Sequence, residues 1–471
     1  MTVWFDVEDL FLFVSSGNKR TSGIQRLTIE IYRAAEALAG ASGAVRFVRH
    51  GRGGALFETV SWAEIARQFA EQESERPAAV PPSRLRRMGR HLALRLPDEL
   101  RKPLVLASVM QVQAVGELAR AGVNLVAHPT GSLVRRASKK RDADAGAPVS
   151  LVDAARPGDA LLVLGSPWFR RDYGALIRWL RDELRMRFGV LVHDLVPIRR
   201  PEWSHAGTPE MFALWHREVL PFCDLVMANS RHTAADVEAF ARETGIMLPG
   251  AVQVLPIGTG FGIQQASGAD SAGLPEPGSY VLFVSTMEAR KNHALAVRVW
   301  SMLLDEVRRG RRAPEAVPDL VFAGRVGWLV NDFLQQLDNT GWLDGRIRQI
   351  PEATDADLRA LYAGCLFTIF PSFHEGWGLP VTESLALGKP CLSSNAGALP
   401  EAGGELCRYF DPEDLQSAFR AVSALLDDRP GLAAWEAQVK AEFRPTAWTE
   451  TARALLDMVA ALGSAPTESR R

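Results

Sequence analysis

With 471 residues, the chain is longer than a single hydrophobic core normally supports, so we expect two packed domains. Hydrophobic residues make up 47% of the chain and charged residues 23%, and these ordinary globular values exclude a mainly disordered protein. The 54 Lys and Arg balance the 55 Asp and Glu. The sequence therefore lacks the basic excess of a nucleic-acid-binding protein, and we expect no nucleic-acid partner.

The N-terminal segment, residues 1–13, carries acidic residues where a secretory signal carries Lys or Arg. No later stretch reaches the roughly 18 consecutive apolar residues of a membrane-spanning helix. The four cysteines form no Cys-x-x-Cys pair and are too few for a disulfide scaffold, so we expect reduced thiols. These features predict a soluble, cytoplasmic protein.

The first half of the chain, residues 1–262, alternates helical and strand-like runs. A helix is predicted over residues 22–40, where Ile24, Leu27 and Ile31 form an apolar stripe at helical spacing. Short runs rich in β-branched residues predict strands at residues 45–50, 123–128, 160–165, 188–197, 224–230 and 252–258. This pattern predicts a first Rossmann-like domain.

A basic, amphipathic segment interrupts this half at residues 75–104. Within residues 84–102, seven Lys and Arg stand against two acids, and Leu85, Met88 and Leu92 recur at helical spacing. Such a segment can lie on an anionic membrane, where each cation contributes about 1 kcal/mol near the surface. That interpretation places the protein at the inner face of the cytoplasmic membrane. The alternative is a solvated helix in an insertion.

A stretch rich in Gly, Ala, Ser and Pro, residues 263–278, predicts an interdomain linker. Beyond it, residues 279–440 alternate short apolar strands with helices. Apolar strands spaced by helices indicate a parallel sheet covered on both faces, which is a doubly wound α/β domain. The predicted strands are residues 280–285, 320–324, 347–350, 365–370, 390–394 and 406–410, and the predicted helices are residues 293–307, 355–364, 380–388 and 412–426.

The stretch of residues 371–401 carries the strongest indication of chemistry. It follows a strand and contains a glycine-rich loop and a helix that begins near Pro380. Ligands of such sheets bind beyond the carboxyl ends of the strands, where free N–H groups at a helix start suit a phosphate or a sugar hydroxyl. Seven residues separate Glu375 and Glu383. We expect these acids to flank an open mouth rather than to be buried structural groups, with one reaching the sugar end of a ligand and the other a ribose.

Residues 374–390, HEGWGLPVTESLALGKP, resemble the Glu-x7-Glu segment of glycosyltransferase family 4. Members of this family are retaining enzymes of the GT-B architecture, in which two Rossmann-like domains face a central cleft. The resemblance covers most of residues 155–460, and the first 150 residues only through SGIQR. The other matching segments are residues 190–203, 228–237, 284–293 and 321–328.

The resemblance implies roles for individual residues. Arg290 and Lys291 would contact the donor diphosphate, Glu375 the sugar hydroxyls and Glu383 the ribose, while His193 would face the sugar from the first domain. Backbone amides of Gly376, Trp377, Gly378 and Leu379 would hold the sugar and phosphate, Pro351 to Ala353 would lie near the base, and Gly23 would border the phosphates. The acceptor would bind to residues 1–262, and the last segment, residues 441–471, would carry a helix that crosses back to the first domain.

Simpler interpretations stand beside these roles. Arg290 and Lys291 can be a solvated helix flank, His193 a structural histidine, and Trp377 a packing residue. Two Asp-x-Asp patterns, at residues 142–144 and 355–357, are better explained by a charged segment and a helix start than by a metal ion. The histidines at 193, 205 and 216 lack zinc-ligand spacing. We therefore expect no metal and no cofactor.

The resemblance as a whole implies transfer of a hexosyl or deoxyhexosyl unit from a nucleotide-diphosphate sugar to a hydroxyl of a growing, lipid-linked glycan. The run of residues 288–292 resembles transferases that build bacterial surface polysaccharides such as O-antigen or capsule, with mannose or rhamnose donors, which favours a GDP-sugar. Two alternatives remain open, namely a nucleotide-sugar epimerase of the same architecture and a non-catalytic glycan- or nucleotide-binding protein.

Overall fold

The computed structural model describes residues 1–15, 23–39, 42–51, 57–74, 149–168, 172–260 and 273–464. The basic segment 75–104, the strand predicted at 123–128 and most of the linker predicted at 263–278 lie outside the described residues. The chain divides into two compact units, Met1–Ala70 with Val149–Arg471, and Glu71–Pro148. The first of these units carries all the features below.

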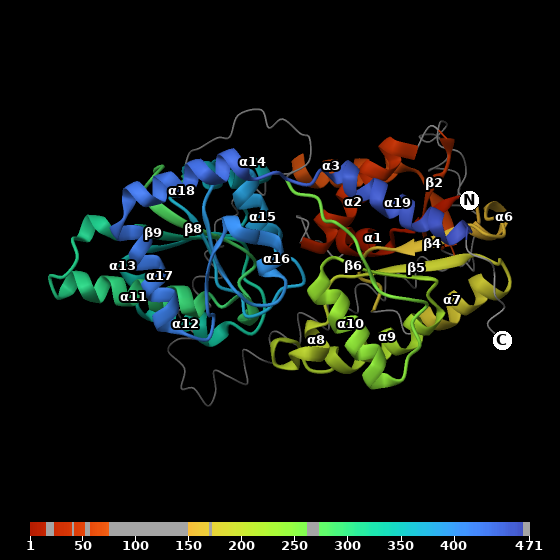
Figure 1. Ribbon diagram of the computed structural model, residues 1–471, viewed down its shortest axis with the longest axis horizontal. Coiled ribbons are helices and arrows are strands. Elements are labelled where there is room, and N and C mark those ends of the chain that lie inside the picture. The colour runs from red at the N-terminus through yellow and green to blue at the C-terminus, as the bar shows by residue number, and fades with distance from the viewer. Residues whose placement is uncertain are drawn as a thin grey trace, which may run out of the picture. The chain divides into compact units, whose positions relative to one another are not determined.

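The N-terminal lobe is built on a sheet with the order β3-β2-β1-β4-β5-β6-β7 among the described residues (Figure 1). All its strand pairs are parallel except β2 with β3, which is antiparallel. Sequence patterns missed the central strand β1 and the edge strand β3, which have only four residues each. The strands are β1 (Val3–Asp6), β2 (Val45–His50), β3 (Phe57–Val60), β4 (Ala160–Val163), β5 (Arg187–Val192), β6 (Leu225–Ala228) and β7 (Gln253–Val254).

Helices cover both faces of this sheet, because side chains of a strand alternate between its faces. Phe5 packs in one apolar cluster with Leu27 and Ile31 of α2, whereas its neighbour Trp4 packs in a second cluster with Ile177 of α7. The sheet is therefore doubly wound. The helices are α1 (Glu8–Ser15), α2 (Gly23–Ala39), α3 (Trp62–Ser74), α6 (Leu151–Ala154), α7 (Tyr173–Asp182), α8 (Val196–Arg199), α9 (Thr208–Val219) and α10 (Arg231–Thr244).

The C-terminal lobe carries a parallel sheet with the order β10-β9-β8-β11-β12-β13 among the described residues. The strand order reverses between β8 and β11, and crevices at such points bind ligands in doubly wound folds. The strands are β8 (Tyr280–Val284), β9 (Asp319–Ala323), β10 (Ile347–Ile350), β11 (Thr368–Phe370), β12 (Cys391–Ser394) and β13 (Arg408–Phe410). The helices are α11 (His293–Arg308), α12 (Asn331–Asn339), α13 (Gly341–Asp344), α14 (Asp355–Gly364), α15 (Leu379–Ala386), α16 (Leu399–Gly403), α17 (Leu415–Asp427) and α18 (Arg429–Glu442).

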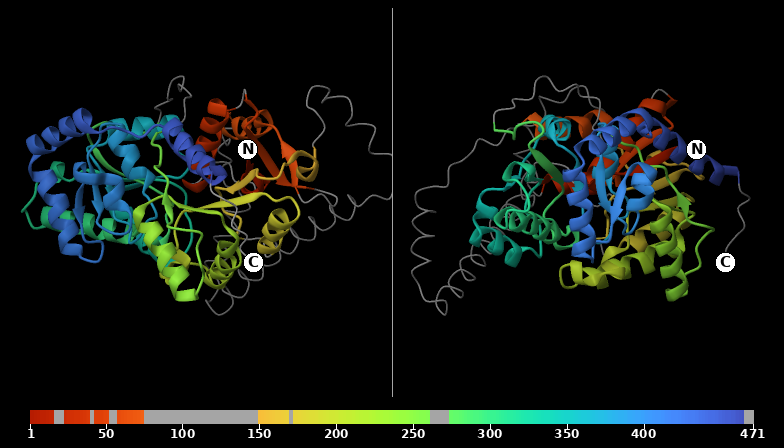
Figure 2. Two further views of the ribbon diagram at one scale, coloured as in Figure 1. Left: turned by 45° about the vertical axis from the view of Figure 1, so that its right-hand side comes forward. Right: turned by 60° about the vertical axis from the view of Figure 1, so that its left-hand side comes forward.

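The last helix, α19 (Trp448–Ser464), returns to the N-terminal lobe, as both views of Figure 2 show. Ala452, Leu455 and Val459 complete the apolar cluster that contains α2. Two connections between the lobes touch here. The amide N of Thr259 donates to the carbonyl O of Thr446 at 2.9 Å, and the indole Nε1 of Trp448 donates to the carbonyl O of Gly260 at 3.3 Å.

Among the residues that the structure describes, no helix combines the length and the apolar character that crossing a bilayer requires.

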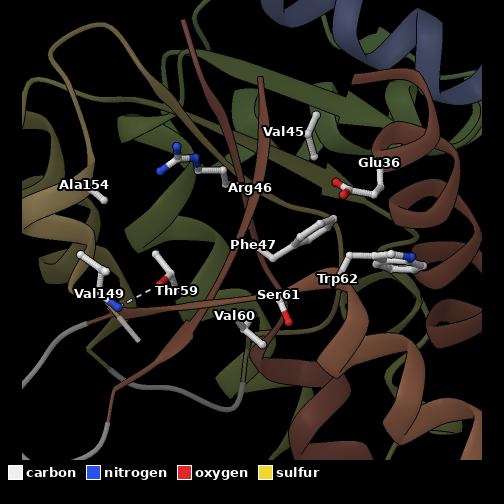
Figure 3. Close-up of a pocket in the computed structure, with 10 residues that line it drawn as sticks. All are labelled: Glu36, Val45, Arg46, Phe47, Thr59, Val60, Ser61, Trp62, Val149 and Ala154. Atoms are coloured by element: carbon white, nitrogen blue, oxygen red, sulfur yellow. Dashed lines mark hydrogen bonds between the residues drawn. The ribbon is translucent and has the colours of Figure 1, made fainter. Parts of the chain in front are cut away.

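A pocket of about 310 Å³ lies beside the outer strands β2 and β3 of the N-terminal lobe (Figure 3). It is closed on one side by residue 149, whose amide N donates to Thr59 Oγ1 at 3.0 Å. Because Val45 begins β2, this pocket lies at the amino end of the parallel strands, away from the edge where ligands of such sheets bind. It is lined by Glu36, Val45, Arg46, Phe47, Thr59, Val60, Ser61, Trp62, Val149 and Ala154.

Candidate active site

The structure brings the two predicted cations and the first predicted acid together. Lys291 Nζ lies 2.6 Å from Glu375 Oε1, and Arg290 Nη1 lies 2.8 Å from Glu375 Oε2. Arg290 also pairs with Glu288, at 2.6 Å between Nη2 and Oε1, and donates to the carbonyl O of His374 at 2.6 Å. The cations follow β8 and the acid follows β11, so the contact forms where the strand order reverses.

Glu375 is buried, with 7% of its surface exposed, contrary to the expectation that it borders an open mouth. Burial alone would raise its pKa, but the charges of Arg290 and Lys291 outweigh burial and hold the pKa at about 2. The carboxylate is therefore ionised, and both its oxygens contact cations. The expectation was wrong because the cations that compensate the buried charge come from a segment about 84 residues earlier.

Glu383 in α15 is also buried, with 3% of its surface exposed. Its partner is Arg26 of α2, whose Nη1 lies 3.0 Å from Glu383 Oε1, and the hydroxyl of Tyr362 donates to Oε2 at 3.1 Å. Burial raises the pKa of Glu383, and the Arg26 charge opposes that rise. Glu383 thus takes part in a contact between the lobes. Sequence analysis missed its partner Arg26, although Arg26 belongs to the SGIQR segment of the resemblance.

His193 lies directly after β5 and is buried, with 6% of its surface exposed. Its Nε2 lies 2.7 Å from the carbonyl O of Leu164, which can only accept, so Nε2 carries the proton and Nδ1 keeps its lone pair. Burial lowers the pKa of the imidazole more than this hydrogen bond and Asp194 raise it. His193 is therefore a neutral side chain with one acceptor nitrogen.

Gly376 connects His193 to the Glu375 loop. A Cβ at position 376 would overlap the carbonyl oxygen of His193, so only glycine allows the two backbones to approach this closely. The Thr233 Oγ1 lies 3.3 Å from the carbonyl O of His193 and 3.4 Å from that of Gly376. Three of the predicted groups, from both lobes, are thus fixed against one another.

The rest of the glycine-rich loop leads into the first turn of α15. Gly378 precedes the helix with φ +116°, a conformation that other residues rarely adopt, and a Cβ there would lie 2.6 Å from Leu399 Cδ2. Trp377 and Leu379 pack against the apolar cluster of α2 and α19 in the N-terminal lobe. Trp377 therefore has a packing role here, and its buried Nε1 has no hydrogen-bond partner among the described residues.

The residues predicted near the base and phosphates lie at a second contact between the lobes. Gly23 begins α2 with open space around it, and Pro351 is exposed. Arg26 Nη2 pairs with Asp355 Oδ1 at 2.8 Å, which joins the segment after Gly23 to the segment after Pro351 and Ala353. Among the described residues, no hydrogen bond or ion pair joins these positions to Glu375.

The two aspartates of the Asp-x-Asp pattern at α14 make contacts that stabilise the fold. Thr354 and Asp357 form a capping box, with Thr354 N donating to Asp357 Oδ2 at 2.8 Å and Asp357 N donating to Thr354 Oγ1 at 3.0 Å. Asp355 pairs with Arg26. The other Asp-x-Asp pattern, residues 142–144, lies outside the described residues.

Asp9 is a second residue that sequence analysis missed. It follows β1 in α1, and its Oδ2 accepts from the amide N of Ser166 at 3.3 Å, just beyond Leu164, which contacts His193. Burial and the nearby Asp6 raise the pKa of Asp9 to about 7. Recognising β1 would have placed Asp9 at the carboxyl edge of the sheet, beside His193.

Residues 268–442 match the family model described as "Glycosyl transferases group 1". The chain contains a group 1 glycosyl transferase domain. This domain carries Arg290, Lys291, Glu375 and Glu383, and the N-terminal lobe contributes His193 and Arg26 to the same contacts.

Several curated proteins resemble the chain that carries this glycosyl transferase domain. It is 36% identical over 149 residues to the O-antigen chain mannosyltransferase B of Escherichia coli, which covers 32% of this chain and 37% of that protein. It is 28% identical over 247 residues to the serotype-specific mannosyltransferase WbdA of Escherichia coli. This alignment covers 50% of this chain and 29% of WbdA. The chain thus spans about a third of the length of these relatives. It is also 26% identical over 370 residues to a D-inositol 3-phosphate glycosyltransferase of Salinispora arenicola. This alignment covers 73% of this chain and 80% of that protein.

Solved structures show the fold of the whole transferase-like chain. HepE of Anabaena, solved with UDP and glucose, superposes with a TM-score of 0.57 at 13% identity and covers 98% of this chain and 100% of its own. A glycosyltransferase of Rickettsia africae gives a TM-score of 0.52 at 13% identity and covers 98% of both chains. These likenesses and the two doubly wound sheets confirm the predicted GT-B architecture.

Proposed function

We propose that this protein is a retaining glycosyltransferase that moves a hexosyl unit, with mannose favoured, from a nucleotide-diphosphate sugar to a hydroxyl of a growing, lipid-linked surface polysaccharide. The observation that carries the proposal is the joint contact of Arg290 and Lys291 with Glu375, beside Gly376 and His193. The group 1 domain and the resemblance to O-antigen mannosyltransferases support it. The mannosyltransferase relatives support mannose as the sugar, and GDP-mannose is the donor that we propose.

Arg290 and Lys291 would hold the donor diphosphate. In the structure, Glu375 contacts both cations and Glu288 also pairs with Arg290, so a diphosphate would replace or share these contacts and leave Glu375 free to accept hydrogen bonds from sugar hydroxyls. Each charge-assisted hydrogen bond contributes about 1.5–3 kcal/mol. The gain is larger when the glycosidic bond breaks, because the leaving diphosphate acquires charge next to cations that are already in place.

The amides at the start of α15 would add to this binding. The helix begins at Leu379 after the left-handed Gly378. Pro380 has no N–H and the amide N of Val381 donates to the carbonyl O of Gly378 at 2.9 Å, so the amides of residue 379 and of the preceding loop would be the donors to an anion or a hydroxyl. His193 would accept a hydrogen bond from a sugar hydroxyl at Nδ1, since Nε2 is engaged with Leu164. Side chains and backbone thus supply every contact in this proposal, and it assigns no step to a metal ion or other cofactor.

Retention would follow from attack on the same face that the diphosphate leaves. The acceptor oxygen bonds to the anomeric carbon, the bond from that carbon to the phosphate oxygen breaks, and the hydroxyl proton passes to the leaving phosphate. Glu375 is a poor alternative nucleophile because both its oxygens contact cations. Closure of the lobes would exclude water and so suppress hydrolysis of the donor.

The test is an incubation of the purified protein with radiolabelled GDP-mannose, with and without a lipid-linked oligosaccharide acceptor. We expect label in the lipid fraction only when acceptor is present, and an anomeric configuration in the product that matches the donor by NMR. A product of inverted configuration would contradict the retaining mechanism. An epimerised sugar nucleotide formed without acceptor would identify an epimerase, and binding without any turnover a non-catalytic protein.

A further inference from the structure

The side chains of His232, Asp236 and His374 form a separate cluster beside these contacts, which use only the backbone carbonyl of His374. His232 and Asp236 are four residues apart on α10, so they share one face of the helix, and His374 lies in the loop after β11 of the other lobe. One ligand atom from each residue lies within 4.8 Å of those from the other two. The two imidazole rings have centroids 5.0 Å apart and an interplanar angle of 62°.

The imidazole nitrogens at the centre of this cluster lack partners. Nε2 of His232 and Nε2 of His374 are both buried, and neither has a hydrogen-bond partner among the described residues. Asp236 Oδ2 lies 3.8 Å from His232 Nε2, which is too long for a hydrogen bond, and its Oδ1 lies 3.6 Å from Arg199 Nε. Buried polar atoms in folded proteins are nearly always paired, so two such nitrogens facing one carboxylate need an explanation.

We propose that His232, Asp236 and His374 form a zinc site that joins the two lobes. Two imidazole nitrogens and one carboxylate oxygen are a ligand set that Zn²⁺ accepts, with water in a fourth position. Tetrahedral bonds of about 2.0–2.1 Å place ligand atoms roughly 3.4 Å apart. The side chains would therefore close by about 1.4 Å, a distance that small side-chain rotations cover.

The position of the cluster gives such a site a structural consequence. His374 immediately precedes Glu375, and α10 already contacts the C-terminal lobe through Glu401, whose carboxylate accepts from the amides of Arg231 and His232 at 2.9 and 2.7 Å. A metal ion here would fix the loop of Glu375 against α10. The site is independent of the proposed function, because it takes no part in the transfer.

The test measures zinc binding by tag-free, EDTA-treated protein in isothermal titration with ZnCl₂, without any sugar nucleotide. We expect one Zn²⁺ per chain, a rise of a few degrees in the melting temperature, and an affinity at least about tenfold weaker in His232→Ala and Asp236→Asn. His205→Ala is the matched control, because it removes an exposed histidine of the same lobe outside the cluster, and we expect unchanged binding. Far-UV circular dichroism of the metal-free proteins checks that the variants fold.

Co²⁺ provides a second readout that does not depend on the variants. Wild-type protein loaded with Co²⁺ should show the intense visible absorption of a four-coordinate ion, and His374→Ala should lose it. Absence of zinc binding by the wild-type protein, equal affinity in wild-type protein and His232→Ala, or a weak six-coordinate cobalt spectrum would each overturn the site. None of these outcomes bears on transfer from GDP-mannose.

Discussion

Arg26 and Glu383 are 357 residues apart in the chain, yet the guanidinium Nη1 lies 3.0 Å from the buried carboxylate Oε1. Arg26 comes from α2 of the N-terminal lobe and also pairs with Asp355 of α14. Glu383, to which the family resemblance gives a contact with the donor ribose, is therefore held by the opposite lobe. Ribose binding would have to rearrange this ion pair.

Replacing Arg26 by Ala should destabilise the protein, because it leaves the buried charge of Glu383 without its cation. Breaking such a pair from one side costs about 3–5 kcal/mol. Equilibrium urea unfolding measures the loss. Arg33→Ala on the same helix is the control, since Arg33 pairs with Glu30 at a more exposed site and should cost less than about 1 kcal/mol. Equal losses in the two variants would contradict the buried role of Arg26.

Lys291→Ala should lower the turnover number by about 10²–10³-fold, as expected for removal of a preorganised group that stabilises a transition state. The matched control is Lys389→Ala. Lys389 is about as buried as Lys291 (side-chain exposure 12% against 14%). It pairs with Glu436 at 3.0 Å rather than with Glu375. Initial rates of mannosyl transfer measure both variants. A similar drop in the control would show that loss of any half-buried lysine pair reduces turnover.

Gly376→Ala should weaken both folding and transfer, because its Cβ would overlap the carbonyl oxygen of His193. Crowding of this kind costs about 1–3 kcal/mol and would push the Glu375 loop away from His193. Thermal unfolding and initial rates test this. Gly250→Ala, where a Cβ meets open space, should leave both unchanged. Wild-type activity in Gly376→Ala would show that the approach to His193 is not needed.

Asp9 should make stability depend on pH. Its pKa is raised from an ordinary value of 3.8 to about 7 in the folded protein, so the folded state holds the proton longer than the unfolded state. Stability contributed by the protonated form is complete below about pH 4 and is lost as pH rises through 7, by about 2–4 kcal/mol. Asp9→Asn should remove this decline and be more stable than wild type at pH 8. Urea unfolding at pH 5 and pH 8 measures the free energy of unfolding of both proteins. An equal change between the two pH values in wild type and Asp9→Asn would contradict the raised pKa.

The architecture was predictable where long, regular patterns exist. The alternation of strands and helices after residue 279 predicted the sheet of the C-terminal lobe, and the GT-B architecture is confirmed. The sequence did not predict β1 because it is a run of only three apolar residues followed by Asp6, nor β3 because it is a short antiparallel edge strand.

The candidate site was predictable where a short segment carries a recognisable pattern, which includes His193 of the N-terminal lobe. The loop around Glu375 and the cations at 290 and 291 could be found from local patterns, and the structure brings them into contact. The partners Arg26 and Asp9 could not, because their contacts depend on which distant segments the fold places together. The burial of Glu375 and Glu383 was missed for the same reason, since a buried carboxylate requires cations that only the tertiary structure supplies.

The hydrogen bonds that link Thr259 to Thr446 and Trp448 to Gly260 have a mechanical effect. They fasten the outgoing and the returning connection side by side, so the two covalent crossings between the lobes pass through one place. Any separation of the lobes at Arg26 and Gly376 would leave this crossing near Trp448 in place, and the crossing would guide the loop of Glu375 back to His193.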